Sequence, residues 1–210
     1  MSVEERLRAV MAAPLASLVA LDRRERPAAS VVERWDLPEK DRAALADWGL
    51  PTDLLMRPVI QDAAEPLLAP NVAGERERRL IDAGQRLYQL GWWGRHDLTP
   101  KIGAVASDGR VLGLRDAPVT AADLPPALRE VYADLYHPAV TFLNSSIAQF
   151  VDIAWRWHAA VAILREFQLQ EPDFARIEAC ERIVLDGVEA IDPAIDADDP
   201  EALWVAIITD

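Results

Sequence analysis

The sequence predicts a single domain that combines helices with strands. A chain of 210 residues is most often one domain with room for a substantial core. Residues 86–114 contain short apolar runs separated by turn residues, which is typical of a strand meander. Residues 144–165 contain the longest helical pattern of the chain, and this helix is apolar on more than one face. We therefore expect the rest of the domain to wrap around that helix.

A first helix is predicted at the N-terminus. Ser2 and Glu5 have the spacing of a capping box, and the helix is expected to end near Pro14. The run from Ala9 to Leu21 is uncharged, but the positively charged start of a signal peptide is missing before it. No stretch approaches the roughly 20 apolar residues that span a membrane. The expected location is therefore the cytoplasm.

A strand and a second helix are predicted next. Residues 30–35, Ser-Val-Val-Glu-Arg-Trp, are rich in β-branched and aromatic side chains and predict a short strand. The helix is expected over residues 39–48. Gly49 is placed to cap its C-terminus in the left-handed conformation, and Pro51 prevents the helix from continuing.

The middle of the chain predicts the strands of the meander. Asp108 and Gly109 stand between two apolar runs, and both residue types tolerate the positive φ of a tight hairpin turn. Residues 73–79 are expected to be a charged loop. The predicted strands cover residues 54–60, 86–93, 101–106 and 110–114.

The second half of the chain predicts one more strand and four helices. The strand covers residues 139–143, and Asn144, Ser145 and Ser146 after it are residue types that cap the long helix. On that basis the substitution Asn144→Ala is expected to cost roughly 1 kcal/mol of stability. A second helix is predicted over 125–135, after a capping box of Thr120 and Asp123. The last one is predicted over 200–208, after Asp199. Between them a helix is predicted to start at Pro172, and its inward residues are expected to be Phe174, Ile177, Cys180, Val184, Val188 and Ile191. Residues 204–209 alone are also compatible with a strand.

The chain is strongly acidic, with a formal net charge of −13. This charge argues against nucleic acid or an anionic membrane as a partner. The last forty residues hold twelve acidic residues against only Arg176 and Arg182. Such a run is either a solvated surface or a docking surface for a basic protein. The candidate contact residues in it are Asp192, Asp196, Asp198, Asp199 and Glu201.

The sequence contains seven tryptophans. Most of them should pack in the core. One or two that are exposed at a groove would be natural anchors for a protein partner, and the adjacent Trp92 and Trp93 are the candidates.

No motif for catalysis, a cofactor or a metal is present. Phosphate-binding glycine loops and the nucleophile elbow are missing, and no cofactor is expected. His96, His137 and His158 lie far apart, and His158 falls on the apolar stripe of the long helix, as expected for a core residue. One enzymatic alternative stays open, a small hydrolase or transferase that uses His96 or His137 with a carboxylate. Cys180 is the only cysteine and is expected to be a buried small apolar residue.

Taken in order, four segments resemble the SUKH superfamily, specifically its fourth immunity-protein family. The resemblance covers roughly residues 30–208, and its most specific part is the strand-to-helix junction with Asn144, Ser145 and Ser146. The other parts are the segment 30–35 before a proline-opened helix, the helix end with Gly49 and Pro51, and residues 88–114 with the Asp108–Gly109 turn. Residues 115–137 depart from the family, because they insert a helix-forming segment where a short connection is usual.

The resemblance implies a single α+β domain, with a mostly antiparallel sheet packed against several helices. Residues 1–29 would be an N-terminal helix and connector, joined to a SUKH-like domain over 30–210. It further implies a non-enzymatic bacterial immunity protein of a polymorphic toxin system, which binds and blocks a cognate toxin. That toxin is expected to be basic, as nucleases are, and the chain a monomer or weak dimer. A regulatory scaffold with the same fold is the alternative, since fold alone does not fix function.

Overall fold

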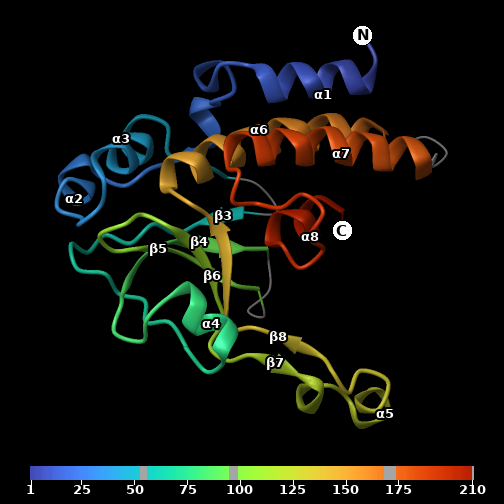
Figure 1. Ribbon diagram of the computed structural model, residues 1–210. Coiled ribbons are helices and arrows are strands. Elements are labelled where there is room, and N and C mark those ends of the chain that lie inside the picture. Colours follow the sequence, from blue (N-terminus) through green and yellow to red (C-terminus); the bar gives the residue numbers. More distant parts are fainter. Residues whose placement is uncertain (53–55, 95–98, 168–173, 210) are drawn as a thin grey trace.

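A central antiparallel sheet with helices packed against it organises the protein (Figure 1). The computed structural model describes residues 1–52, 56–94, 99–167 and 174–209. The sheet has the order β3-β4-β5-β6-β9, and each neighbouring pair is antiparallel. The predicted α+β fold of one domain is confirmed. The five strands are β3 (Met56–Pro58), β4 (Leu87–Trp93), β5 (Lys101–Val105), β6 (Val111–Leu114) and β9 (Val140–Asn144).

The helix α6 (Ile147–Phe167) lies at the centre of the helical layer. It packs against α1, α3 and α7, and α1 lies across the α6–α7 pair on the side away from the sheet (Figure 1). The bounds of its neighbours are α1 (Val3–Ala12), α3 (Glu39–Asp47), α7 (Phe174–Ile191) and α8 (Leu203–Thr209). Most apolar side chains of α6 are buried, and Phe150, Ile153 and Trp155 are fully buried. The expectation that the domain wraps this helix is confirmed.

The two faces of the sheet bury two separate apolar clusters. Consecutive strand residues point to opposite faces, so Tyr88 and Val111 join the large cluster under the helices, while Leu87 and Leu112 join a smaller one. The smaller cluster is covered by residues 68–81, which include the short helix α4 (Glu75–Leu80). Both faces are therefore closed to solvent over much of the sheet.

The N-terminal residues are part of the same core. The capping box of Ser2 and Glu5 is formed, and Leu7 of α1 is fully buried in the large cluster. Arg156 of α6 donates to the carbonyl oxygens of Val10 and Met11 (2.8 and 2.6 Å), which satisfies the C-terminal end of α1. The remaining short elements of this region are η1 (Leu15–Ser17), η2 (Leu21–Arg23), β1 (Arg24–Glu25), α2 (Ala29–Val32) and β2 (Leu50–Pro51), with β1 paired to β2.

Residues 115–137 form an arm that projects from the sheet, away from the helical layer (Figure 1). Its elements are β7 (Val119–Thr120), η3 (Ala121–Asp123), α5 (Pro126–Arg129) and β8 (Tyr136–His137), and β7 pairs with β8. The fully buried Glu77 of α4 holds the base of the arm by accepting from the Tyr136 hydroxyl and the Ala139 backbone N–H (2.8 and 2.9 Å). Burial opposes the ionised form of Glu77, but these and further hydrogen bonds outweigh it and lower its pKa.

Two predictions for the N-terminal half are wrong. Residues 30–35 form no strand, because α2 and a turn occupy them. Val31 and Val32 are both buried in the large cluster, and Trp35 stacks on Tyr88 of β4 at 4.5 Å between ring centroids. Packing thus overrides the strand preference of the valines. The predicted charged loop at 73–79 contains α4, whose start Glu77 caps through the Gly74 backbone N–H.

The remaining predicted boundaries need smaller corrections. The helix expected at 125–135 is a single turn, α5, followed by turns. The last helix begins at Leu203, three residues after the predicted start. Phe174, expected to be inward on α7, is 73% exposed. The predicted start of that helix at Pro172, and the first residues of the predicted strand 54–60, lie outside the described residues.

Gly49 closes α3 as predicted, with a φ of +62°. A Cβ added there would lie 2.4 Å from the carbonyl oxygen of Glu25 in β1, so the site is closed by sterics as well as by backbone conformation. We expect Gly49→Ala to lower the free energy of unfolding by about 2 kcal/mol or more, measured by urea unfolding. The matched control is Gly84→Ala, where an added Cβ has no neighbour within 4 Å. Equal effects of both substitutions would contradict this account.

Candidate functional site

The junction between β9 and α6 is built around a buried carboxylate from another part of the chain. Asp192, directly after α7, accepts hydrogen bonds from Asn144 Nδ2 at 3.0 Å and from the Ser145 backbone N–H at 2.7 Å. Its second oxygen accepts from the Ser145 hydroxyl at 2.8 Å. The Asn-Ser-Ser segment is therefore hydrogen-bonded within the protein, to the carboxyl group that follows α7.

Asn144 also connects the junction to the last helix. Its Oδ1 accepts from the indole Nε1–H of Trp204 in α8 at 3.0 Å, and both side chains are buried. Trp204 packs edge-on against Trp93 of β4, with ring centroids 5.4 Å apart. One asparagine thus links β9, α7 and α8.

The N-terminus of α6 is capped by Ser146 and Asp41. The Ser146 hydroxyl oxygen accepts from the Gln149 backbone N–H at 3.3 Å. Asp41 of α3 accepts from the Ala148 backbone N–H at 2.8 Å. The expectation that Asn144 caps this helix is wrong, because Asn144 is the last residue of β9 and both ends of its amide bind other partners.

The Asp108–Gly109 turn contacts this cap. Ser107 and Gly109 have the positive φ of the turn, 76° each. A Cβ on Gly109 would lie against Asp41 Oδ2, which has no hydrogen-bond partner among the described residues. Burial raises the pKa of Asp41, against the hydrogen bond from Ala148. The glycine therefore makes room for a half-satisfied carboxyl at the start of α6.

Two of the segments that carry the resemblance, Gly49–Pro51 and Asn144–Ser146, contact α6 or its start. The Gly49 carbonyl accepts from Trp155 Nε1 of α6 at 3.0 Å, and Pro51 follows in β2, which packs on the same helix. Asn144 and Ser146 are buried, and Ser145 is bound to a carboxylate. Their arrangement is that of a structural junction.

The acidic C-terminal residues separate into one buried and four exposed. Asp192 is only 1% exposed, so its assignment as a partner-contact residue is wrong in this structure; the junction occupies its oxygens. Asp196, Asp198, Asp199 and Glu201 are exposed in the connector between α7 and α8. Arg182 forms an ion pair with Asp198, and Arg76 of α4 forms one with Glu201 at 2.8 Å.

The two adjacent tryptophans also differ in environment. Trp93 is 9% exposed and belongs to the core, but it also lines a large groove between the arm and the helical layer, so its role as an anchor stays a prediction. Trp92 points to the other face of β4, is half-buried, and has the Arg57 guanidinium 5.8 Å from its ring centroid.

In the part of the chain that the structure describes, no hydrogen bond pairs a histidine with a carboxylate as a catalytic pair would require. His96 lies outside the described residues. His137 is exposed on β8, and in the described part of the chain it has no hydrogen bond to a carboxylate. His158 is half-buried and meets the Trp155 ring edge-on, at 5.6 Å. Among the described residues no group of histidines, cysteines and acids could hold a metal ion, and no helix is long and apolar enough to cross a membrane.

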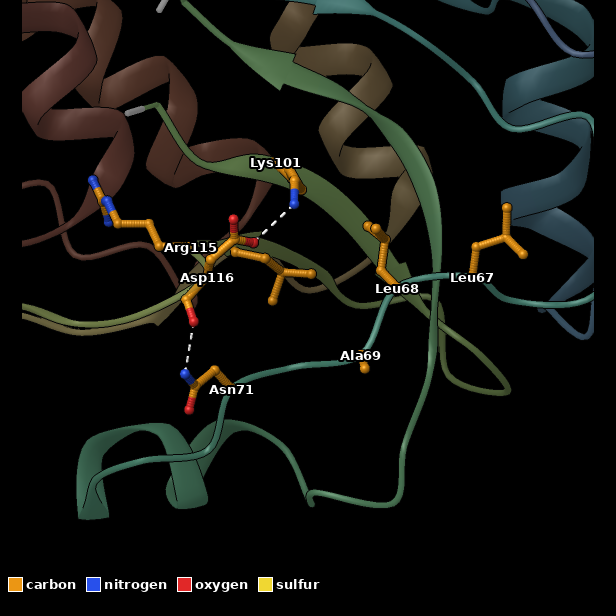
Figure 2. Close-up of a pocket in the computed structure, with 8 residues that line it drawn as sticks. Leu67, Leu68, Ala69, Asn71, Lys101, Arg115 and Asp116 are labelled. Atoms are coloured by element: carbon orange, nitrogen blue, oxygen red, sulfur yellow. Dashed lines mark hydrogen bonds and ion pairs between the residues drawn. The ribbon is translucent and has the colours of Figure 1, made fainter. Parts of the chain in front are cut away.

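A small pocket of about 300 Å³ lies at the base of the arm (Figure 2). Two of its charged groups are paired with each other, since Lys101 Nζ is 2.8 Å from Asp116 Oδ1, and Asn71 Nδ2 donates to the Asp116 carbonyl oxygen at 2.7 Å. These bonds tie the start of the arm to β5 and to the loop at 71. Figure 2 shows Arg115 extending away from them.

A much larger groove, of about 1450 Å³, lies between the arm and the helical layer. One wall is the end of the arm, residues 134–138. The opposite wall is made by α6, α7 and α8, with Trp157, Val161, Leu164, Ile177 and Ile207 among its apolar lining. Arg115 also lines the groove, and burial lowers the pKa of its guanidinium. The groove is thus a concave surface with a largely apolar lining.

The comparisons with known proteins decide the family. The family model described as SUKH-4 immunity protein matches residues 10–210. The chain belongs to the SUKH-4 immunity protein family. No curated protein and no solved structure matches it significantly.

Two features of this SUKH-4 family member were missed by sequence reasoning. The burial of Asp192 has a signal, because Cys180, Val184, Val188 and Asp192 repeat every four residues on the inward stripe of α7. The groove has no such signal, because its two walls lie far apart in sequence and are brought together by the sheet.

Removal of the Asn144 side chain should cost more than the loss of a helix cap. Asn144→Ala leaves the Trp204 indole N–H without a buried partner and removes one of the two hydrogen bonds to Asp192 Oδ2, so we expect a loss of about 2–4 kcal/mol. Urea unfolding measures it. The control Asn71→Ala removes an exposed hydrogen bond and should change stability by about 0.5 kcal/mol or less. A loss near 1 kcal/mol would instead favour a capping role.

The buried Asp41 should make stability depend on pH. Its folded-state pKa is raised above the ordinary value of 3.8, so its contribution to stability is fully present below that value and is lost as the pH rises through the folded-state pKa. The stability of the wild type relative to Asp41→Asn should therefore fall from pH 4 upward and then level off, as measured by urea unfolding. A difference in stability between the two proteins that stays constant with pH would contradict this account.

Proposed function

We propose that this chain binds a cognate bacterial toxin and neutralises it by covering its working surface, without catalysing a reaction. Membership in the SUKH-4 immunity protein family is the observation that carries this proposal. The absence of a catalytic motif in the sequence and the internal use of the Asn-Ser-Ser segment support a binding role. We further propose that the protein acts in the cytoplasm as a monomer or weak dimer.

The charge distribution favours a basic toxin, such as a nuclease domain. The net charge of −13 makes nucleic acid and anionic membranes poor partners for this chain. The connector between α7 and α8 presents Asp196, Asp198, Asp199 and Glu201 to solvent. Within the described ranges, arginines pair with only Asp198 and Glu201. Such a field attracts a cationic partner and raises the rate of association.

The proposal is tested with the protein encoded by the neighbouring gene as the probe. Co-expression of the wild-type chain should restore the growth of cells that express this toxin candidate, and the two purified proteins should form a complex. A chain that neither binds the candidate nor restores growth would contradict the proposed function.

The acidic connector should control the association rate. Replacement of Asp196, Asp198 and Asp199 by Asn and of Glu201 by Gln should lower the rate constant by about tenfold or more at low ionic strength, and much less at high salt. Surface plasmon resonance measures both. The matched control neutralises four exposed acids elsewhere: Glu25→Gln, Glu33→Gln, Asp62→Asn and Glu65→Gln. If both variants associate equally fast, the connector is not the docking surface.

A further inference from the structure

The groove between the arm and the helical layer is too large for a typical small-molecule site. Pockets for metabolites and drugs measure about 300–1,000 Å³, and this groove measures about 1450 Å³. Its lining combines apolar side chains from α6 and α8 with a few charged residues at separate places. These dimensions fit a segment of polypeptide.

The α7 side of the groove carries negative charge without a counter-ion. Glu178 and Glu181 lie one helical turn apart and both line the groove. No ion pair of either residue exists among the described residues. Burial raises the pKa of Glu181, and the neighbouring Glu178 carboxylate raises it further. A cation placed between them would relieve both costs.

The base of the groove carries the opposite charge. Arg115 follows β6, is half-buried, and has no ion pair or side-chain hydrogen bond in the described part of the chain. A half-buried guanidinium is favoured by a carboxylate or a carbonyl oxygen that binds to its fork of donors. The groove therefore has two acids on α7 and a cation at the sheet, and its lining further includes Arg76, Asp134, Arg165 and Glu201.

Exposed apolar side chains occur in the groove and at the tip of the arm whose end forms one of its walls. Phe174, at the start of α7, lines it and is 73% exposed. The tip of the arm exposes Leu128, Val131 and Tyr132, and the buried Glu77 fixes the base of this arm. Large apolar groups that are exposed together and rimmed by polar residues mark protein–protein contacts.

From these features we infer that the groove receives a protruding segment of the cognate toxin, with a lysine or arginine next to an apolar side chain. The basic side chain lies between Glu178 and Glu181, the apolar side chain lies against Phe174 and Ile177, and an acidic or carbonyl group of the segment meets Arg115. This inference rests on the proposed function and adds the surface and the chemistry of the contact.

A charge-reversal variant tests the inference. Glu178→Lys with Glu181→Lys should weaken binding of the neighbouring-gene toxin candidate by about tenfold or more, measured by isothermal titration calorimetry. The matched control is Glu33→Lys with Glu189→Lys, which changes the net charge equally at exposed positions outside the groove lining and should bind within about threefold of the wild type. Circular dichroism and thermal melting establish that both variants are folded.

A second variant tests the apolar contact without changing charge. Phe174→Ala removes a mostly exposed ring, so it should leave stability within about 0.5 kcal/mol, as such surface changes do, but weaken binding about fivefold or more. Hydrogen–deuterium exchange of the wild-type complex should show protection in α7 and in residues 134–138. This measurement needs no substitution.

The outcomes separate the two proposals. If the wild type binds the toxin candidate but the groove variants bind as tightly as their control, and residues of the groove gain no protection, the groove inference is overturned while the proposed function stands. If the wild type does not bind at all, the proposed function fails and the inference fails with it. Binding that is lost only in the groove variants supports both.

Discussion

The structure depends on one buried carboxylate. Asp192 binds the Asn144 side chain and the Ser145 backbone, and so fastens the end of α7 to the point where β9 becomes α6. A buried charge is stable only when hydrogen bonds replace the water that it has lost, and the Asn-Ser-Ser segment supplies three of them. Asn144 also accepts a hydrogen bond from the indole N–H of Trp204 in α8. This single site therefore holds α7 and α8 against the end of β9, although neither helix is adjacent to β9 in the sequence.

The elements with strong local signals could be predicted from the sequence, while those set by distant contacts could not. The helix that ends at Gly49 and the hairpin through Asp108 and Gly109 depend on backbone conformations that few residue types adopt, so they were readable. The segment 30–35 was not, because its valines pack against the core and Trp35 stacks on Tyr88, a residue more than fifty positions away. Glu77 likewise looked like one charge in a charged loop until its partners in the arm were known.

The acidic character of the candidate site could be predicted from the sequence, but the arrangement of its residues could not. The acidic character of the last forty residues correctly indicates four exposed carboxylates in the connector between α7 and α8. Composition does not tell which member of an acidic run is buried, whereas the four-residue repeat from Cys180 to Asp192 does. The groove could not be predicted from the sequence. Arg115, which follows β6, and Glu181 on α7 both line it, and they come together only in the assembled fold.

The residues that identify the family and those that would contact a toxin are different, but the structure connects them. Trp204, fixed by Asn144, holds α8 against the sheet, and the same helix presents Leu203 and Ile207 to the groove. The Arg76–Glu201 ion pair joins the connector before α8 to α4, the helix that also anchors the arm. Both walls of the groove are therefore positioned by buried or bridging polar contacts. Lining residues such as Trp93 and Ile208 belong to the core, whereas Glu178 and Phe174 are exposed and lie outside it. On the proposed function, partner specificity resides in such exposed charges and apolar side chains, so one fold can serve different partners without a change in its core.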